Sequence, residues 1–243
     1  MILKLYKKGE ILFSLIWIGI YCFSMSFADI LSEKIGINSI FSLPVIIILS
    51  LILLTFIYKN NLNIKYGLCK PAIPPSKMLF YIPLLILLTV NLRHGIVPNL
   101  SIIETLLYIF TMLCVGFYEE ILFRGLLFNA MLKDNRNAAV FVSSITFGLG
   151  HIINLVNGSG ISVTENILQI VSAIAVGYLF VVIYQKSKSL TPCIITHGLF
   201  NSLSAFANES TTTASEIFSC IFIVLLSVIY SVLIIRINKN IDN

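Results

Sequence analysis

Two adjacent glutamates, Glu119 and Glu120, interrupt an apolar stretch that runs from about residue 102 to residue 132. A carboxylate inside a lipid bilayer costs roughly 3 kcal/mol or more, so acidic side chains in such a stretch indicate a functional site. On a helix, Glu120 and Arg124 are four residues apart and share a face, which predicts an ion pair between them. Glu119 points to another part of the bundle and remains available as a general base.

Two further apolar segments carry polar side chains at helical spacing. Ser144, Gly148 and His151 recur at i, i+4 and i+7, a pattern that places His151 on a face where neighbouring helices approach closely. His197 begins a second polar stripe, which continues with Asn201, Ser204 and Asn208. Each of these residues alone could serve only to join two helices, and the acidic pair could be purely structural. Their joint presence at compatible depth favours catalysis over packing.

The elements that must position these side chains are membrane helices. Hydrophobic residues make up 58% of the chain and charged residues only 11%, a balance that excludes an ordinary soluble domain. A helix needs about 20 apolar residues to cross the hydrocarbon core of a membrane. We therefore expect an all-α polytopic membrane protein, an eight-transmembrane-helix bundle, with spans at 11–31, 40–58, 79–97, 102–132, 137–155, 165–185, 190–208 and 215–236.

Lysine and arginine residues predict the orientation, because cytoplasmic loops of membrane proteins keep an excess of positive charge. With eight spans and a cytoplasmic N-terminus, the outer segments hold only Lys34 and Arg93 of the 16 basic residues, and both termini are cytoplasmic. The net charge of +5 then reflects the inner side of the membrane and gives no reason to expect a nucleic-acid partner. The remaining basic residues, on the inner side, are Lys4, Lys7, Lys8, Lys59, Lys65, Lys70, Lys77, Arg124, Lys133, Arg136, Lys186, Lys188, Arg236 and Lys239.

Residues 1–243 form a single membrane domain by this interpretation, without a water-soluble part. With about 1.5 Å of rise per residue, Glu119 and His151 lie roughly 20 Å, and His197 roughly 10 Å, from the cytoplasmic ends of their helices. We therefore expect the three side chains in one layer of the inner half of the membrane. A site at that depth needs a water path, which we expect from the cytoplasmic side.

Three short motifs follow one another along the chain. Glu119-Glu120-Ile-Leu-Phe-Arg124 fits the pattern EExxxR, Phe147-Gly-Leu-Gly-His151 fits FxxxH, and His197-Gly-Leu-Phe-Asn201 fits HxxxN. In this order, on successive membrane helices, they resemble the three signatures of the CPBP intramembrane protease family, also called the CAAX protease or Abi family. The segment Ser189-Leu190-Thr191-Pro192 before the third motif also resembles that family.

The resemblance covers roughly residues 70–208, where we expect a CPBP-like protease core. Two N-terminal helices in 1–69 lie outside the motif region, and a final helix in 209–243 follows it. The resemblance implies an intramembrane endopeptidase in an eight-helix bundle whose site opens toward the cytosol. Glu119 and His151 would activate a water molecule, His197 and Asn201 would stabilise the oxyanion, and the predicted ion pair would organise the site.

The family also suggests a class of substrate. It includes the type II CAAX prenyl endopeptidases and bacterial members linked to peptide processing or bacteriocin self-immunity. Size and composition resemble a bacterial chain more than a eukaryotic one, so we expect a multi-pass protein of the bacterial plasma membrane. Its predicted substrate is a membrane-associated peptide or protein, such as a signalling-peptide or bacteriocin precursor, and prenylated CAAX proteins fit less well.

The sequence leaves the need for a metal open. Glu119, His151 and His197 would supply a carboxylate and two imidazoles, a known ligand set for catalytic zinc. These residues come from separate helices, however, and the sequence lacks the HExxH pattern of soluble metalloproteases. The alternative is a glutamate-activated water without a metal, with His197 and Asn201 as oxyanion donors.

Two other functions would use the same residues. A proton-coupled transporter would relay protons through the glutamates and histidines, although the sequence shows no paired, broken helices in corresponding halves. A non-catalytic membrane scaffold or immunity protein would bind a partner through the bundle. Replacing Glu119 with glutamine separates the three functions, because it should abolish proteolysis, alter proton coupling, or leave a scaffold largely working.

Overall fold

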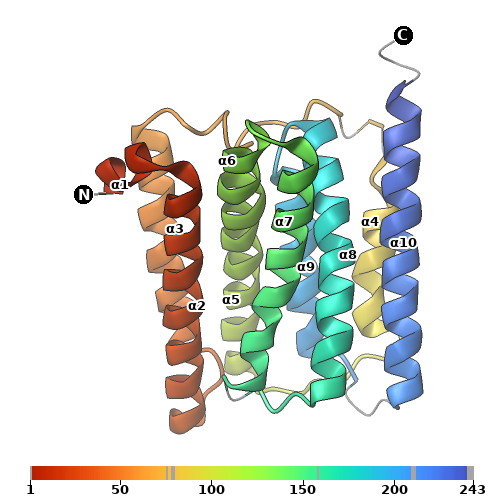
Figure 1. Ribbon diagram of the computed structural model, residues 1–243. Helices are drawn as coiled ribbons and strands as arrows, with labels where there is room; N and C mark the ends of the chain where they lie inside the picture. Colours follow the sequence, from red (N-terminus) through yellow and green to blue (C-terminus); the bar gives the residue numbers. More distant parts are fainter. Residues whose placement is uncertain (1, 75, 78–79, 158, 209–211, 240–243) are drawn as a thin grey trace.

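A computed structural model of the chain is a bundle of helices that run side by side (Figure 1). The structure describes residues 2–74, 76–77, 80–157, 159–208 and 212–239. Within these ranges, the only β pairing is an isolated bridge between Ile96 and Ala207. The helices are α1 (Ile2–Lys8), α2 (Glu10–Ile35), α3 (Ser42–Lys59), α4 (Ile82–Thr89), α5 (Ile102–Glu120), α6 (Asn129–Leu132), α7 (Arg136–Leu149), α8 (Val163–Ser187), α9 (Thr191–Leu203) and α10 (Thr213–Lys239). A π-helix, Ile121–Phe128, joins α5 to α6, and 3₁₀ turns follow α4, α7 and α9 at Val90–Leu92, Gly150–Leu155 and Ser204–Phe206.

The described part of the chain contains six helices that are long and apolar enough to cross a membrane, which confirms a polytopic helical membrane protein. The predicted spans at 79–97 and 190–208 contain shorter helices, α4 and α9. Residue 79 at the start of one predicted span, and residues 209–211 and 240–243 of the predicted final segment, lie outside the described residues. The six long stretches fall on the other predicted spans, at Glu10–Ile35, Ser42–Lys59, Ile102–Leu132, Arg136–Leu155, Val163–Ser187 and Thr213–Arg236.

The bundle has two ends, which we call the α1 face and the opposite face. At the α1 face, at the top of Figure 1, Glu10 at the start of α2 pairs with Lys65 at 2.6 Å and with Lys133 at 2.5 Å. The hydrogen bond to Glu10 raises the pKa of Lys133. At the opposite face, the backbone N–H of Asn38, after α2, donates to the Glu104 carboxylate at 3.1 Å near the start of α5.

The two shorter helices are continued toward the opposite face by non-helical chain. The Val97 N–H donates to the Phe206 carbonyl at 3.0 Å, and the Asn99 side chain donates to the Ala207 carbonyl at 2.7 Å. Non-helical backbone close to lipid needs hydrogen-bond partners inside the protein. These bonds supply such partners where α4 and α9 end, so both segments can be short helices without leaving their backbone groups unpaired.

The connection between α3 and α4 folds over the α1 face. The Leu190 N–H donates to the Gly67 carbonyl at 2.8 Å, and the Ala72 N–H donates to the Ser187 carbonyl at 2.7 Å. Tyr66, next to Gly67, is buried beneath this connection. The connection between α3 and α4 therefore covers the end of α8 and the start of α9 at the α1 face.

Helices α5 and α9 touch through two glycines. A Cβ atom added to Gly116 of α5 would lie 2.5 Å from the backbone nitrogen of Gly198 in α9 and 2.7 Å from its Cα. Small residues let membrane helices approach closely in this way. Gly116 is three residues before Glu119, and Gly198 directly follows His197, so this contact fixes how near the two side chains can come.

Replacing Gly116 with alanine is expected to lower the free energy of unfolding by about 1–3 kcal/mol, because the added methyl group forces two backbones apart. Thermal unfolding of the purified protein in detergent micelles would measure the loss. Gly19→Ala is the matched control, since Gly19 is an exposed residue of α2 with no atom within 4 Å of the added Cβ. Equal melting temperatures for the two variants would contradict the role of this contact.

Candidate active site

The predicted ion pair between Glu120 and Arg124 is present. Arg124 Nη1 lies 2.8 Å from Glu120 Oε1, and both side chains are fully buried. The guanidinium carbon of Arg124 stands 4.1 Å from the ring centre of Phe147 and 5.5 Å from that of Phe180. A buried charge requires partners of this kind, because an unpaired one would be far too costly.

The π-helix that carries Arg124 is a local departure from regular α-helix. Each of its eight residues, Ile121–Phe128, is buried. The side chain of Asn129 donates to the carbonyls of Gly125 at 2.7 Å and Arg124 at 3.1 Å, and also to the Tyr184 hydroxyl at 2.7 Å. Segments of π-helix are frequent at functional sites, and here Asn129 provides hydrogen bonds for carbonyls that regular α-helical pairing would use.

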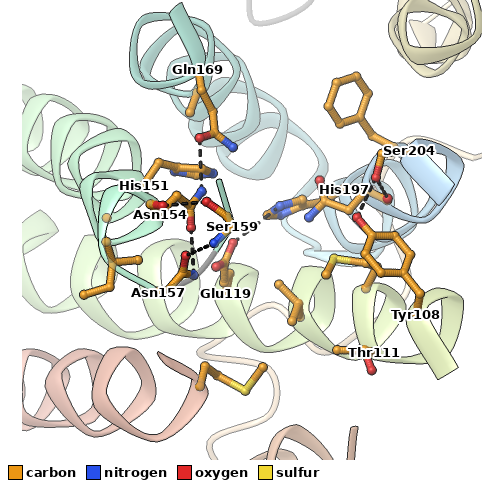
Figure 2. A pocket seen from close by; sticks show the side chains of 18 of the residues that line it. Tyr108, Thr111, Glu119, His151, Asn154, Asn157, Ser159, Gln169, His197 and Ser204 are labelled. Atoms are coloured by element: carbon orange, nitrogen blue, oxygen red, sulfur yellow. Dashed lines mark hydrogen bonds and ion pairs between the residues drawn. The ribbon is translucent and has the colours of Figure 1, made fainter. Parts of the chain in front are cut away.

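His197 lies between the two glutamates. Its Nδ1 is 2.9 Å from Glu120 Oε1, and its Nε2 is 3.4 Å from Glu119 Oε2. Because a carboxylate oxygen accepts hydrogen bonds, Nδ1 is the donor toward Glu120. The imidazole is therefore held by the buried ion pair, while Nε2 faces Glu119. Figure 2 shows the side chains of His197 and Glu119 next to each other in the pocket.

His151 and Asn201 complete the set of side chains from the three motifs. His151 lies in the 3₁₀ turn after α7, with Nδ1 3.2 Å from the Phe147 carbonyl oxygen. Its own carbonyl accepts a hydrogen bond from the Asn166 side chain at 2.8 Å. Asn201 is one helical turn beyond His197 on α9.

The cavity at this site measures about 910 Å³, near the upper end of the roughly 300–1,000 Å³ that ligand pockets occupy. Glu119, His151, His197 and Asn201 all line it. The structure thus brings into the wall of one cavity four side chains that the sequence spreads over more than 80 positions. The ion pair of Glu120 with Arg124 lies behind this wall, in contact with His197.

Tyr21 of α2 is a site residue that the sequence analysis missed. Its hydroxyl donates to Glu119 Oε1 at 2.6 Å, and its ring packs at 5.2 Å from that of Tyr118. Tyr21 belongs to a buried face of α2 with Trp17, Met25 and Ala28, which recur at helical spacing. A tyrosine among the buried residues of a membrane helix is a signal that could have revealed it, because its hydroxyl needs a hydrogen-bond partner there.

The sequence analysis also missed a polar cluster on the cavity wall beside His151. The Asn154 side chain donates to Gln169 at 3.0 Å, Asn157 donates to Asn154 at 3.3 Å, and the Ser159 hydroxyl donates to the Asn154 carbonyl. Figure 2 shows these side chains gathered on one side of Glu119. They lie in the 3₁₀ turn after α7, in the following loop and on α8, so no single helical period in the sequence reveals them.

The cavity extends from Glu119 toward the opposite face. Its lining residues on α5 run from Glu104, at the opposite end of that helix, to Glu119, and those on α8 run from Leu168 to Phe180. The predicted water path from the cytoplasm and the predicted cytoplasmic termini therefore do not both fit this lining, because the cavity reaches the face opposite α1. Glu119 is indeed nearer the α1 end of its helix, but the buried side chains of 121–128 fill the space between it and that face.

The residues considered as zinc ligands do not fit a metal site as they lie. Among the described residues, no three His, Cys, Asp or Glu side chains form a group that could hold a metal ion. Glu119 and His197 face each other at 3.4 Å, but His151 turns its Nδ1 to the Phe147 carbonyl. We therefore derive no catalytic step through a metal.

A comparison with protein families matches residues 101–203 to the family described as type II CAAX prenyl endopeptidase Rce1-like. This segment contains all three motifs and every side chain that the motifs place on the cavity wall. No curated protein matches the chain. The family match confirms the resemblance to the CPBP or CAAX proteases that the motifs indicated.

Proposed function

We propose that this chain is an intramembrane endopeptidase whose active site lies in residues 101–203, the segment that matches the type II CAAX prenyl endopeptidase family. The observation that carries the proposal is the shared cavity wall of Glu119, His151, His197 and Asn201. The protease core extends over residues 70–208. The substrate is a membrane-associated peptide or protein.

In the proposed reaction Glu119 is the general base. Tyr21 holds its Oε1 at 2.6 Å, so Oε2 is the oxygen that accepts a proton from water, with His151 orienting that water from the other side of the cavity. The water oxygen bonds to the amide carbon, and the carbon–nitrogen bond breaks as Glu119 returns the proton to the leaving amine. General bases of this kind contribute about 10²–10⁴-fold to a rate.

His197 and Asn201 are the proposed oxyanion donors. Nε2 of His197 faces the cavity while Nδ1 donates to Glu120, so in the proposed step the ring carries a proton on both nitrogens and Nε2–H donates to the oxygen that becomes negative. Fixed donors in a site shielded from water stabilise such a charge without having to rearrange. In this scheme Glu120 and Arg124 are positioning residues, because they act through His197 and do not line the cavity.

The proposed topology has eight crossings with both termini in the cytoplasm, in a bacterial plasma membrane. Helices α4 and α9 are counted as crossings although they are short, since the hydrogen-bonded segments 93–101 and 204–208 continue them. The α1 face is then cytoplasmic. Its many lysines and arginines support this assignment by the positive-inside rule.

A comparison of peptide profiles tests the proposed activity. Membranes and medium from cells that express the wild type or Glu119→Gln would be analysed by mass spectrometry, with equal protein amounts checked by immunoblot. We expect at least one peptide that accumulates uncleaved only in cells with the variant. Identical profiles would count against a protease.

A substitution of Tyr21 tests whether its hydroxyl positions the carboxylate of Glu119. Tyr21→Phe removes the hydrogen bond to Glu119 and keeps the ring that packs on Tyr118. A hydrogen bond to a charged group contributes about 1.5 kcal/mol or more, so kcat should fall roughly 10-fold with KM little changed. Steady-state kinetics would measure this, with Tyr58→Phe as the control because Tyr58 is exposed on α3. Equal kcat in both variants would remove Tyr21 from the site.

A further inference from the structure

We infer that the substrate reaches Glu119 from the opposite face of the bundle, the non-cytoplasmic side, and not from the cytoplasm. The inference deepens the proposed function and rests on its topology. It assigns the substrate to peptides or protein segments that are exposed outside the cytoplasm. Three features of the molecule carry it: a closed α1 side, a polar cavity mouth, and the distribution of basic residues.

The α1 side of the site is closed by packed side chains. Between Glu119 and the α1 face lie Glu120, Arg124 and the other residues of the π-helix, all of them buried. Above these, Gly67 of the α3–α4 connection is bonded to Leu190, and Leu190 is itself fully buried. Within the described chain, the loops of the α1 face contribute no residue to the lining of the cavity. A peptide therefore has no open path from that side.

The opposite end of the cavity is lined by loops and polar side chains. Glu33, Asn38 and Glu104 line it where α2 ends and α5 begins, and Asn157 and Ser159 line it in the connection between α7 and α8. Several of these positions are exposed at the surface of the bundle. Polar groups at a cavity mouth keep it hydrated, so water and an extended peptide can both enter there.

The depth of the cavity sets the length of chain that must enter. Glu104 and Glu119 lie at the two ends of the lining residues on α5, and 15 residues of helix rise about 22 Å. An extended chain covers at most about 3.5 Å per residue. The scissile bond must therefore lie about six or seven extended residues inward from the point where the peptide leaves water.

The distribution of basic residues identifies the opposite face as the outer one. Lys34, at the end of α2, and Arg93, after α4, are the basic residues on the outer side of the proposed topology. Cytoplasmic loops keep most of the lysine and arginine, so the α1 face is the inner one. The C-terminus of a prenylated cytoplasmic protein would then approach the closed side of the site. A secreted peptide, or the external end of a membrane protein, would approach the open side.

Cysteine labelling in intact cells tests the side of access. Ser26 of α2 lines the cavity, and Lys70 is exposed in the α3–α4 connection on the α1 face. Ser26→Cys and Lys70→Cys would each be made in a chain whose five native cysteines are replaced. A membrane-impermeant maleimide should label Ser26→Cys in intact cells and should label Lys70→Cys only after the membrane is permeabilised.

The other outcomes would overturn the inference. Labelling of Ser26→Cys only from the cytoplasmic side would place the opening there, and its failure to react under either condition would show a cavity closed to water. Labelling of Lys70→Cys in intact cells would show that the α1 face lies outside the cell, opposite to the proposed orientation. If the cysteine-free chain does not fold, Ser26→Cys and Ser26→Ala can each be made in the otherwise native chain. The labelling of Ser26→Ala then measures the contribution of native Cys22, which also lines the cavity, and the excess in Ser26→Cys measures position 26.

The labelling result does not depend on proteolysis. A chain with Glu119→Gln should be labelled at Ser26→Cys as fast as one with Glu119, since both have the same cavity. External labelling combined with identical peptide profiles would refute the protease and leave the side of access intact. Altered peptide profiles combined with labelling only from the cytoplasm would support the protease and refute external access.

Discussion

A protein with glutamine in place of Glu119 is expected to hydrolyse its substrate about 10³-fold more slowly than the wild type, within the range that general bases contribute. Glutamine has nearly the same shape, and its carbonyl oxygen can still accept the hydrogen bond from Tyr21 that holds Oε1 at 2.6 Å. It cannot accept a proton from water. Single-turnover kinetics on a peptide found by the profile comparison would measure the loss.

Asp134→Asn is the matched control for this prediction, since it is also a carboxylate-to-amide change. Asp134 is exposed between α6 and α7 and does not line the cavity, so the rate of this variant should equal that of the wild type. A Glu119→Gln protein that keeps a tenth or more of the rate would refute the role of Glu119 as the base. If proton-coupled uptake changes and peptide cleavage is never found, the transporter becomes the better explanation.

The sequence allowed prediction of the elements whose physical cause is local. Six long helices fall on predicted spans, because the thickness of a bilayer demands a minimum apolar length. The ion pair of Glu120 with Arg124 also follows from helical spacing alone. Both features depend on residues that are neighbours in the sequence, and so the pattern of the sequence contains them.

Features that depend on packing between helices could not be predicted in this way. The bond from Tyr21 to Glu119 joins residues 98 positions apart, and the place of His197 between two carboxylates depends on the contact of Gly116 with Gly198. The end of the bundle toward which the cavity extends could not be predicted for a related reason. The position of a residue along its helix gives its distance from each face of the bundle. Whether the site is open or closed toward a face depends on packing, here on the buried side chains of residues 121–128.

The largest effect on stability is expected from Arg124→Met. The variant would leave the fully buried Glu120 with His197 as its remaining partner at 2.9 Å, and breaking a buried ion pair typically costs about 3–5 kcal/mol. The melting temperature in detergent micelles should fall accordingly. Arg136→Met is the control, since Arg136 is exposed at the start of α7, where it bonds to Gln185, and its loss should change stability little.

The double variant Glu120→Gln with Arg124→Met separates charge from packing. It removes both charges together, and replacing a buried pair by neutral groups is often close to neutral for stability, so most of the melting temperature should return. Catalysis should stay well below that of the wild type, because the neutral amide oxygen of glutamine would hold Nδ1 of His197 less strongly than the carboxylate does. A double variant as unstable as Arg124→Met would show that the guanidinium acts mainly by packing on Phe147 and Phe180. Recovery of stability without activity would instead establish the ion pair as the support that orients His197 toward Glu119.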